Sequence, residues 1–284
     1  MTKFMPELVS TSWLDERLVR GDIAVLDATR HLPGADRDAR AEFQAAHIPG
    51  AMFLDLDTLT DETSAVPYAV PSAEQLQHRL ADAGVAPGTG IVVYDDSSIK
   101  SAARAWFILK AHGIENAAIL DGGFGKWRAE DRAIQSGARD AARAEPFEMD
   151  TPSNVADKDE MLTNLETGRE QVIDARGADR VFGIGDDPVH GGANGRIPGS
   201  LNVPYTKVFN EDGTYRSPEE LRATFKAAGV DLDRPVVTTC GSGITASVLL
   251  FALHLIGKDD VRLYDGSWSE WSKDPATPKA QGPA

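Results

Sequence analysis

The sequence is poor in several features, and each shortage excludes a class of protein. Cys240 is the only cysteine among 284 residues, so an internal disulfide and a CxxC metal or redox pair are excluded. No apolar run approaches a membrane span, and the first residues lack the apolar core of a signal peptide. A lone cysteine fits a reducing compartment, so we expect a cytoplasmic protein. The lack of a span leads us to expect no membrane partner.

Basic residues are also scarce compared with acidic ones. The chain has 29 Lys and Arg against 44 Asp and Glu, a formal net charge of −15. This balance disfavours nucleic acids and anionic membranes as partners. An anionic substrate would need local positive charge, because the field of the whole protein opposes it.

The sequence around Cys240 predicts a site. A β-branched run, Val236–Thr239, predicts a buried strand, and the apolar stretch Ala246–Ile256, closed by Gly257, predicts a buried helix. The loop between them contains two glycines, which permit backbone angles that other residues resist. The loop can therefore direct successive N–H groups at one point above a helix N-terminus, which favours negative charge.

A cysteine in that position should exist partly as the thiolate, which is the nucleophilic form. The alternative is that Cys240 is a small buried hydrophobic residue, as lone cysteines most often are. Its place at a strand end favours a functional role, because open α/β sheets bind their ligands there.

The chain contains an internal repeat. Ile91–Trp127 aligns without gaps to Pro235–Trp271, and this alignment places Asp96 opposite Cys240. We therefore predict an N-terminal domain over residues 1–134, a linker over 135–159 and a C-terminal domain over 160–284. Asp96 is either a helix N-cap or a poor substitute for a nucleophile, so we expect the first domain to be catalytically silent.

Both halves alternate short apolar strands with helices, which predicts an α/β fold with a parallel sheet covered on both faces. The predicted strands are Ile23–Leu26, Ala51–Leu54, Ile91–Tyr94, Ala117–Leu120, Val172–Asp174, Ser200–Val203, Val236–Thr239 and Val261–Tyr264. The predicted helices are Leu76–Ala83, Ser101–His112, Pro218–Ala228 and Ala246–Ile256, with Ser72 and Ser217 as N-caps of the two that precede the buried helices.

Three motifs resemble the two-domain rhodanese family of sulfurtransferases. The loop from Cys240 to Ala246, CGSGITA, is similar to the CGSGVTA of the mercaptopyruvate branch. The segment Tyr264–Trp271 resembles the closing motif of the family, and the IPG tripeptides at 48–50 and 197–199 resemble its repeated HIPGA signature. The resemblance implies two tandem rhodanese-like domains, each a parallel sheet flanked by helices.

The resemblance also implies a chemistry. Cys240 would take a sulfane sulfur from a small anionic donor, becoming a persulfide, and pass it to a thiol or cyanide. The donor would be 3-mercaptopyruvate, with thiosulfate as the alternative, and the acceptor a protein thiol such as thioredoxin or a low-molecular-weight thiol. No metal or organic cofactor is implied. A non-catalytic sulfur-binding scaffold is a further alternative.

Site residues follow from the family motif position by position. Arg180 matches a substrate-binding arginine, a side chain whose fork suits a carboxylate. The second family arginine is replaced by Val189, and the family histidine by Tyr68; His190 and Arg196 could replace the arginine. The remaining expected site residues are Asp57, Gly241, Ser242, Gly243, Ile244 and Thr245, with Asp57 and Ser242 as catalytic partners of Cys240.

A cysteine-based phosphatase or arsenate reductase, with a fold that resembles the rhodanese fold, is a competing hypothesis. Its chemistry requires an arginine at the end of the loop to hold the oxyanion, and Ala246 stands at that position here. The sequence therefore disfavours phosphatase chemistry.

Overall fold

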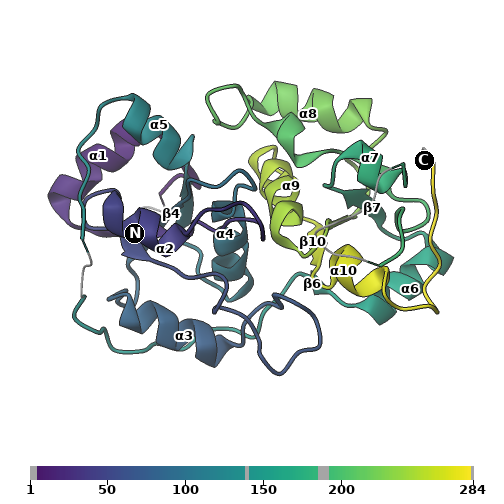
Figure 1. Ribbon diagram of the computed structural model, residues 1–284, viewed down its shortest axis with the longest axis horizontal. Coiled ribbons are helices and arrows are strands. Elements are labelled where there is room, and N and C mark those ends of the chain that lie inside the picture. The colour runs from purple at the N-terminus through teal and green to yellow at the C-terminus, as the bar shows by residue number, and fades with distance from the viewer. Residues whose placement is uncertain (1–4, 138–140, 185–191, 283–284) are drawn as a thin grey trace. The chain divides into compact units, whose positions relative to one another are not determined.

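A computed structural model describes residues 5–137, 141–184 and 192–282. The chain forms two compact units (Figure 1). Unit 1 comprises Met1–Asp61, Val70–Ser153 and Glu211–Thr214, and unit 2 comprises Glu62–Ala69, Asn154–Asn210 and Tyr215–Ala284. The main segments of the two units meet at residues 153 and 154, inside the stretch predicted as a linker.

Each unit contains a five-stranded sheet, and the two sheets have the same topology. The strand order is β1-β5-β4-β2-β3 in unit 1 and β6-β10-β9-β7-β8 in unit 2. All of these pairs are parallel. The strands of unit 1 are β1 (Leu8–Val9), β2 (Ile23–Asp27), β3 (Met52–Phe53), β4 (Gly90–Tyr94) and β5 (Ala117–Leu120). Those of unit 2 are β6 (Val155–Ala156), β7 (Gln171–Asp174), β8 (Leu201–Asn202), β9 (Val236–Thr239) and β10 (Val261–Tyr264).

Helices connect the strands, as parallel pairing requires. Those of unit 1 are α1 (Thr11–Arg20), α2 (Ala39–Ala45), α3 (Ala73–Asp82), α4 (Ala102–Ala111) and α5 (Gly123–Ala129). Those of unit 2 are α6 (Lys158–Thr167), α7 (Ala178–Val181), the 3₁₀ turn η1 (Tyr205–Val208), α8 (Pro218–Ala227), α9 (Ile244–Leu255) and α10 (Ser267–Trp271). Ser72 and Ser217 form the predicted N-caps, each within a capping box.

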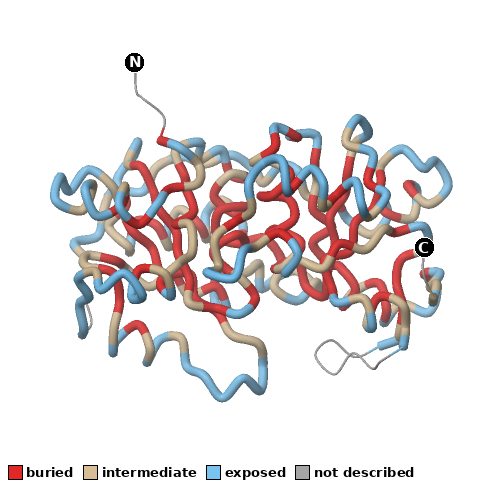
Figure 2. The backbone as a smooth tube through the Cα atoms, turned by 90° about the horizontal axis from the view of Figure 1, so that it is seen from above, coloured by how far each residue is buried: buried red, intermediate tan, exposed pale blue. Residues whose placement is uncertain are grey.

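The core of each unit lies around the central strands, and Figure 2 shows the buried backbone in the interior with exposed turns outside it. Helices α4 and α9 are buried on nearly all sides, as their apolar sequences predict. No helix in the described part of the chain is long and apolar enough to cross a membrane. The last residues of the predicted linker form β6 and begin α6, which the sequence did not predict.

The strand register aligns the two repeats independently of their sequences. In unit 1, Asp27 at the end of β2 lies opposite Tyr94 at the end of β4. In unit 2, Asp174 at the end of β7 lies opposite Thr239 at the end of β9. Tyr94 therefore corresponds to Thr239.

The residue that corresponds to Cys240 is consequently Asp95. The N–H of Phe124 donates to the Asp95 carbonyl at 3.0 Å, and the N–H of Trp268 donates to the Cys240 carbonyl at 3.0 Å. The prediction that Asp96 occupies the cysteine position was wrong. The unit 1 loop has one more residue than the unit 2 loop, which a gapless alignment cannot represent. Because Asp95 and Asp96 are both aspartates, the residue type did not reveal this offset of one position.

Candidate active site

Cys240 lies at the carboxyl end of β9, a strand in the interior of the unit 2 sheet. Its side chain is buried, at 2% exposure, and it is a free cysteine. Helix α9 begins four residues later at Ile244. The strand, loop and helix place Cys240 where open α/β sheets bind ligands.

The loop presents backbone N–H groups that are not used by the fold. Gly243 is the N-cap of α9 and has a φ of 78°, a left-handed conformation that glycine adopts at little cost. Among the described residues, the amides of Gly241, Ser242, Ile244 and Thr245 have no hydrogen-bond partner. Together with the positive end of a 12-residue helix, these amides favour negative charge in the loop.

Ser267 fixes the shape of this loop, a role that the sequence did not reveal. Its hydroxyl accepts hydrogen bonds from the N–H groups of Cys240 at 3.2 Å and Gly243 at 3.1 Å, and donates to the Tyr264 carbonyl at 2.8 Å. The Ser269 N–H donates to the Gly241 carbonyl at 2.9 Å. Both ends of the loop are therefore tied to the segment that opens α10.

The corresponding loop of unit 1 already contains an anionic group. The Asp95 carboxylate accepts the N–H of Ser97 at 2.9 Å and that of Ala102, the first residue of α4, at 2.7 Å. Burial raises the pKa of Asp95, and these two hydrogen bonds oppose that shift. Amides of this loop type thus bind an acidic side chain at the position of Cys240. Unit 1 has an aspartate where unit 2 has the cysteine.

A buried ion pair supports the same edge of unit 2. The guanidinium of Arg176 donates to both carboxylate oxygens of Asp174, at 2.7 and 3.1 Å, and to the Gly195 carbonyl at 2.8 Å. It also lies 4.6 Å from the ring centroid of Trp268. Trp268 directly follows Ser267, so this ion pair helps to position the residue that holds the loop. No sequence motif indicates this ion pair.

Arg180 is the predicted substrate-binding residue that lies at this edge. It belongs to α7, which follows β7, and β7 and β9 end side by side at Asp174 and Thr239. The side chain is half-buried. Burial raises the pKa of Tyr205, and the positive charge of Arg180 opposes this, so the two groups are close in space.

Arg196 lies elsewhere in unit 2. It is buried, and its guanidinium donates to the carbonyls of Gly282 at 3.1 Å and Ser200 at 3.2 Å. This geometry indicates that Arg196 anchors the C-terminal segment; a contact with a donor stays a prediction. Val189 and His190 lie outside the described residues.

The two remaining predicted catalytic residues belong to different units. Ser242 is buried within the Cys240 loop, and its hydroxyl has no hydrogen-bond partner among the described residues. Asp57 belongs to unit 1, where its largely exposed carboxylate accepts a hydrogen bond from Nε of Arg30 at 2.6 Å. Tyr68, at the position of the family histidine, has a φ of 60°.

Removal of the Ser267 hydroxyl tests how the loop is held. In Ser267→Ala, two buried N–H groups lose their acceptor, at a cost of about 1–3 kcal/mol each in the free energy of unfolding. We expect iodoacetamide to alkylate Cys240 at least about tenfold more slowly, because a loosened loop stabilises the thiolate less. Ser269→Ala is the matched control, since the Ser269 hydroxyl bonds to the Gly266 carbonyl instead. Unchanged alkylation in a folded Ser267→Ala protein would exclude this role.

Comparisons with known proteins agree with this geometry. The family profile described as "Rhodanese-like domain" matches residues 10–130 and again 157–274. The chain is 41% identical to 3-mercaptopyruvate sulfurtransferase of Mus musculus over 93% of this chain and 91% of that protein. It is 38% identical to thiosulfate sulfurtransferase of Rattus norvegicus over 97% of this chain and 95% of that protein.

A solved structure matches the whole fold. The crystal structure of SseA from Escherichia coli, described as a 3-mercaptopyruvate sulfotransferase, has a TM-score of 0.84 and 35% sequence identity. The match covers 93% of this chain and 99% of that chain. Two matched segments, two sheets of identical strand order and this similarity establish that the chain belongs to the rhodanese-like family, with the domain present in two copies.

Proposed function

We propose that this chain is a sulfurtransferase in which Cys240 transfers sulfane sulfur from a small anionic donor to a thiol or cyanide. With 3-mercaptopyruvate, the thiolate attacks the donor sulfur and the carbon–sulfur bond breaks. The carbon fragment takes up a proton to become pyruvate, and Cys240 is left as a persulfide. An acceptor thiolate then attacks the outer sulfur, becomes the new persulfide and releases the Cys240 thiolate.

The observation that carries this proposal is the surroundings of the only cysteine. Cys240 lies in a loop with four unused amides at a helix N-terminus, and the corresponding loop of unit 1 uses such amides to bind a carboxylate. Both the thiolate and the persulfide are anions, so the same amides stabilise the nucleophile before and after sulfur is loaded.

We place 3-mercaptopyruvate first among donors and thiosulfate second. Relatives named for each donor are similar to this chain. The loop from Gly241 to Thr245 has no basic residue, and a doubly charged thiosulfate is less well compensated there than the single carboxylate of 3-mercaptopyruvate. Initial rates with each donor, measured with cyanide and with a dithiol as acceptors, test this order: a higher kcat/KM for thiosulfate contradicts it.

Arg180 is the proposed ligand of the donor carboxylate. We expect Arg180→Ala to raise the KM for 3-mercaptopyruvate about tenfold to a hundredfold, because a charged, forked hydrogen bond is lost, while kcat changes less. Arg169→Ala is the matched control: Arg169 is exposed and has no partner among the described residues. Equal KM values in both variants would remove Arg180 from the site.

The acceptor and the compartment are also part of the proposal. We propose a thiol acceptor such as thioredoxin or a low-molecular-weight thiol, and a reducing cytoplasmic environment, because a single nucleophilic cysteine must remain reduced to react. Formation of thioredoxin persulfide by the sulfur-loaded protein is the corresponding assay, and failure of every thiol to unload Cys240 would contradict it.

A further inference from the structure

Each repeat has a buried carboxylate at the end of a central strand, and the two carboxylates have different partners. In unit 2, the guanidinium of Arg176 is held by three groups: the Asp174 carboxylate, the Gly195 carbonyl and the ring of Trp268. Arg176 is 2% exposed and Asp174 is 1% exposed. These three groups form a buried site for a planar cation.

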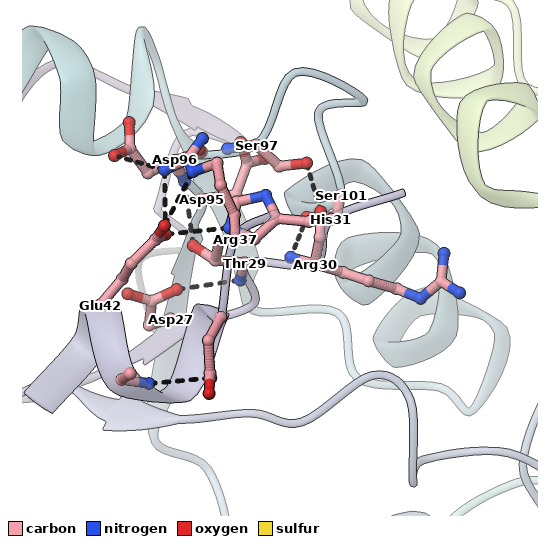
Figure 3. Close-up of polar contacts among 12 residues, drawn as sticks. Asp27, Thr29, Arg30, His31, Arg37, Glu42, Asp95, Asp96, Ser97 and Ser101 are labelled. Carbon is pink, nitrogen blue, oxygen red and sulfur yellow. Dashed lines mark hydrogen bonds and ion pairs between the residues drawn. The ribbon is translucent and has the colours of Figure 1, made fainter. Parts of the chain in front are cut away.

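In unit 1, the corresponding carboxylate lacks the cation. Asp27 is the counterpart of Asp174 by register, but Thr29 stands where unit 2 has Arg176. Asp27 is 3% exposed and accepts the N–H of Thr29 at 2.9 Å (Figure 3). No cationic side chain of the described residues pairs with it. The next residue, Arg30, extends away from Asp27 and bonds to Asp57.

A cavity of about 220 Å³ lies at this carboxylate. Its lining includes the counterparts of all three groups that hold the guanidinium in unit 2: Asp27, Ala46 and Phe124. Phe124 corresponds to Trp268 by the hydrogen bonds of their N–H groups to equivalent carbonyls.

The correspondence of Ala46 follows from the residue after it. His47 and Arg196 each directly precede the repeated IPG motif. Each forms an antiparallel bridge, His47 to Gln135 and Arg196 to Ala280. Ala46 therefore corresponds to Gly195, whose carbonyl accepts the guanidinium in unit 2. Thr29 also lines the cavity, so the space lies beside the residue that is too short to fill it.

The other charges of the cavity are already compensated. Arg37 bonds to Glu42 at 2.7 Å, and Arg128 bonds to Asp96 at 2.8 Å while lying 4.9 Å from the Phe124 ring centroid. The lining thus has three carboxylates and two guanidinium groups, which leaves one net negative charge. That charge belongs to Asp27.

We propose that this cavity of unit 1 binds a small guanidinium compound, which occupies the place that the Arg176 side chain occupies in unit 2. A guanidinium is planar and donates two parallel hydrogen bonds to a carboxylate, so it fits this site better than an ammonium ion. Burial raises the pKa of Asp27 to about 6, so the carboxylate is mostly ionised at neutral pH and gains a counter-ion on binding.

Isothermal titration of the full-length protein with ethylguanidinium at neutral pH tests the proposal. We expect saturable binding, at least about tenfold tighter than that of ethylammonium. Asp27→Asn should weaken ethylguanidinium binding at least about tenfold. Thr29→Arg should abolish it, because the introduced side chain occupies the cavity as Arg176 does. Asp131→Asn, which neutralises an exposed carboxylate in a left-handed conformation that asparagine tolerates, should bind like the wild type.

Several results would overturn this inference. They are the absence of saturable binding, equal affinity for ethylguanidinium and ethylammonium, and wild-type binding in a folded Thr29→Arg protein. Thr29→Arg keeps the test decisive if Asp27→Asn fails to fold. It leaves the buried carboxylate in place and supplies it with a partner. Neither variant alters the Cys240 loop, so the outcome is independent of the proposed sulfurtransferase activity.

Discussion

A Cys240→Ser protein is expected to lose sulfur transfer by at least about a thousandfold while keeping its fold. The chain has no second cysteine to form a persulfide, and a serine hydroxyl is neither ionised near neutral pH nor able to carry sulfane sulfur. Serine replaces one buried small side chain by another of similar size, so its thermal unfolding should stay close to that of the wild type. Initial rates with 3-mercaptopyruvate and a dithiol acceptor provide the measurement.

Asp95→Asn is the control for this variant, because it alters the corresponding position of unit 1. Its side-chain carbonyl still accepts the N–H of Ala102 at the start of α4, and the proposed mechanism does not use unit 1 chemistry there. We expect it to retain most of the activity. Turnover of a few per cent or more in a Cys240→Ser sample free of wild type would rule out the persulfide mechanism.

Asp27→Asn is expected to stabilise the protein at neutral pH. Burial raises the pKa of Asp27 from 3.8 to about 6. At a pH between these two values, the folded state keeps a proton on Asp27 that the unfolded state has released. The resulting stabilisation is fully present below the unfolded pKa and is lost as pH rises through the folded pKa. The loss amounts to roughly 3 kcal/mol at most, since one pKa unit corresponds to about 1.4 kcal/mol.

The measurement is the difference in thermal unfolding between Asp27→Asn and the wild type across pH. The unfolding temperature of the variant should rise relative to that of the wild type as pH increases from about 4 to about 7. Above that range the difference should stay constant. Asp131→Asn is the matched control, because it removes an exposed carboxylate instead of a buried one. A flat curve for Asp27→Asn would show that the carboxylate is compensated in the folded protein.

The central strands and the long helices were predictable because their signals are local. β-branched runs gave β4 and β9, and apolar stretches of helical length gave α4 and α9. The edge strands β1 and β6 have two residues each, which is too short to show the alternating hydrophobic pattern of a strand. Short helices such as α7 depend on packing more than on their own four residues.

The site was predictable only where its residues adjoin one another in sequence. The Cys240 loop has its chemistry in one segment, so its glycines and its following helix indicated an anion-binding turn. Ser267 lies 27 residues from Cys240, and a serine alone does not indicate which amides it will accept. The uncompensated Asp27 required knowledge of the strand register, because only that identifies Thr29 as the counterpart of Arg176.

Mass spectrometry of the intact protein after incubation with 3-mercaptopyruvate tests the central claim most directly. We predict that the protein gains the mass of one sulfur atom and that peptide mapping assigns it to Cys240. The Cys240→Ser protein should not gain this mass. An added thiol should remove the sulfur from the wild type and form the acceptor persulfide. Thiosulfate in place of 3-mercaptopyruvate reports the alternative donor in the same assay. A wild-type protein that acquires no sulfur from either donor, while its Cys240 remains reduced and reacts with iodoacetamide, would contradict the account.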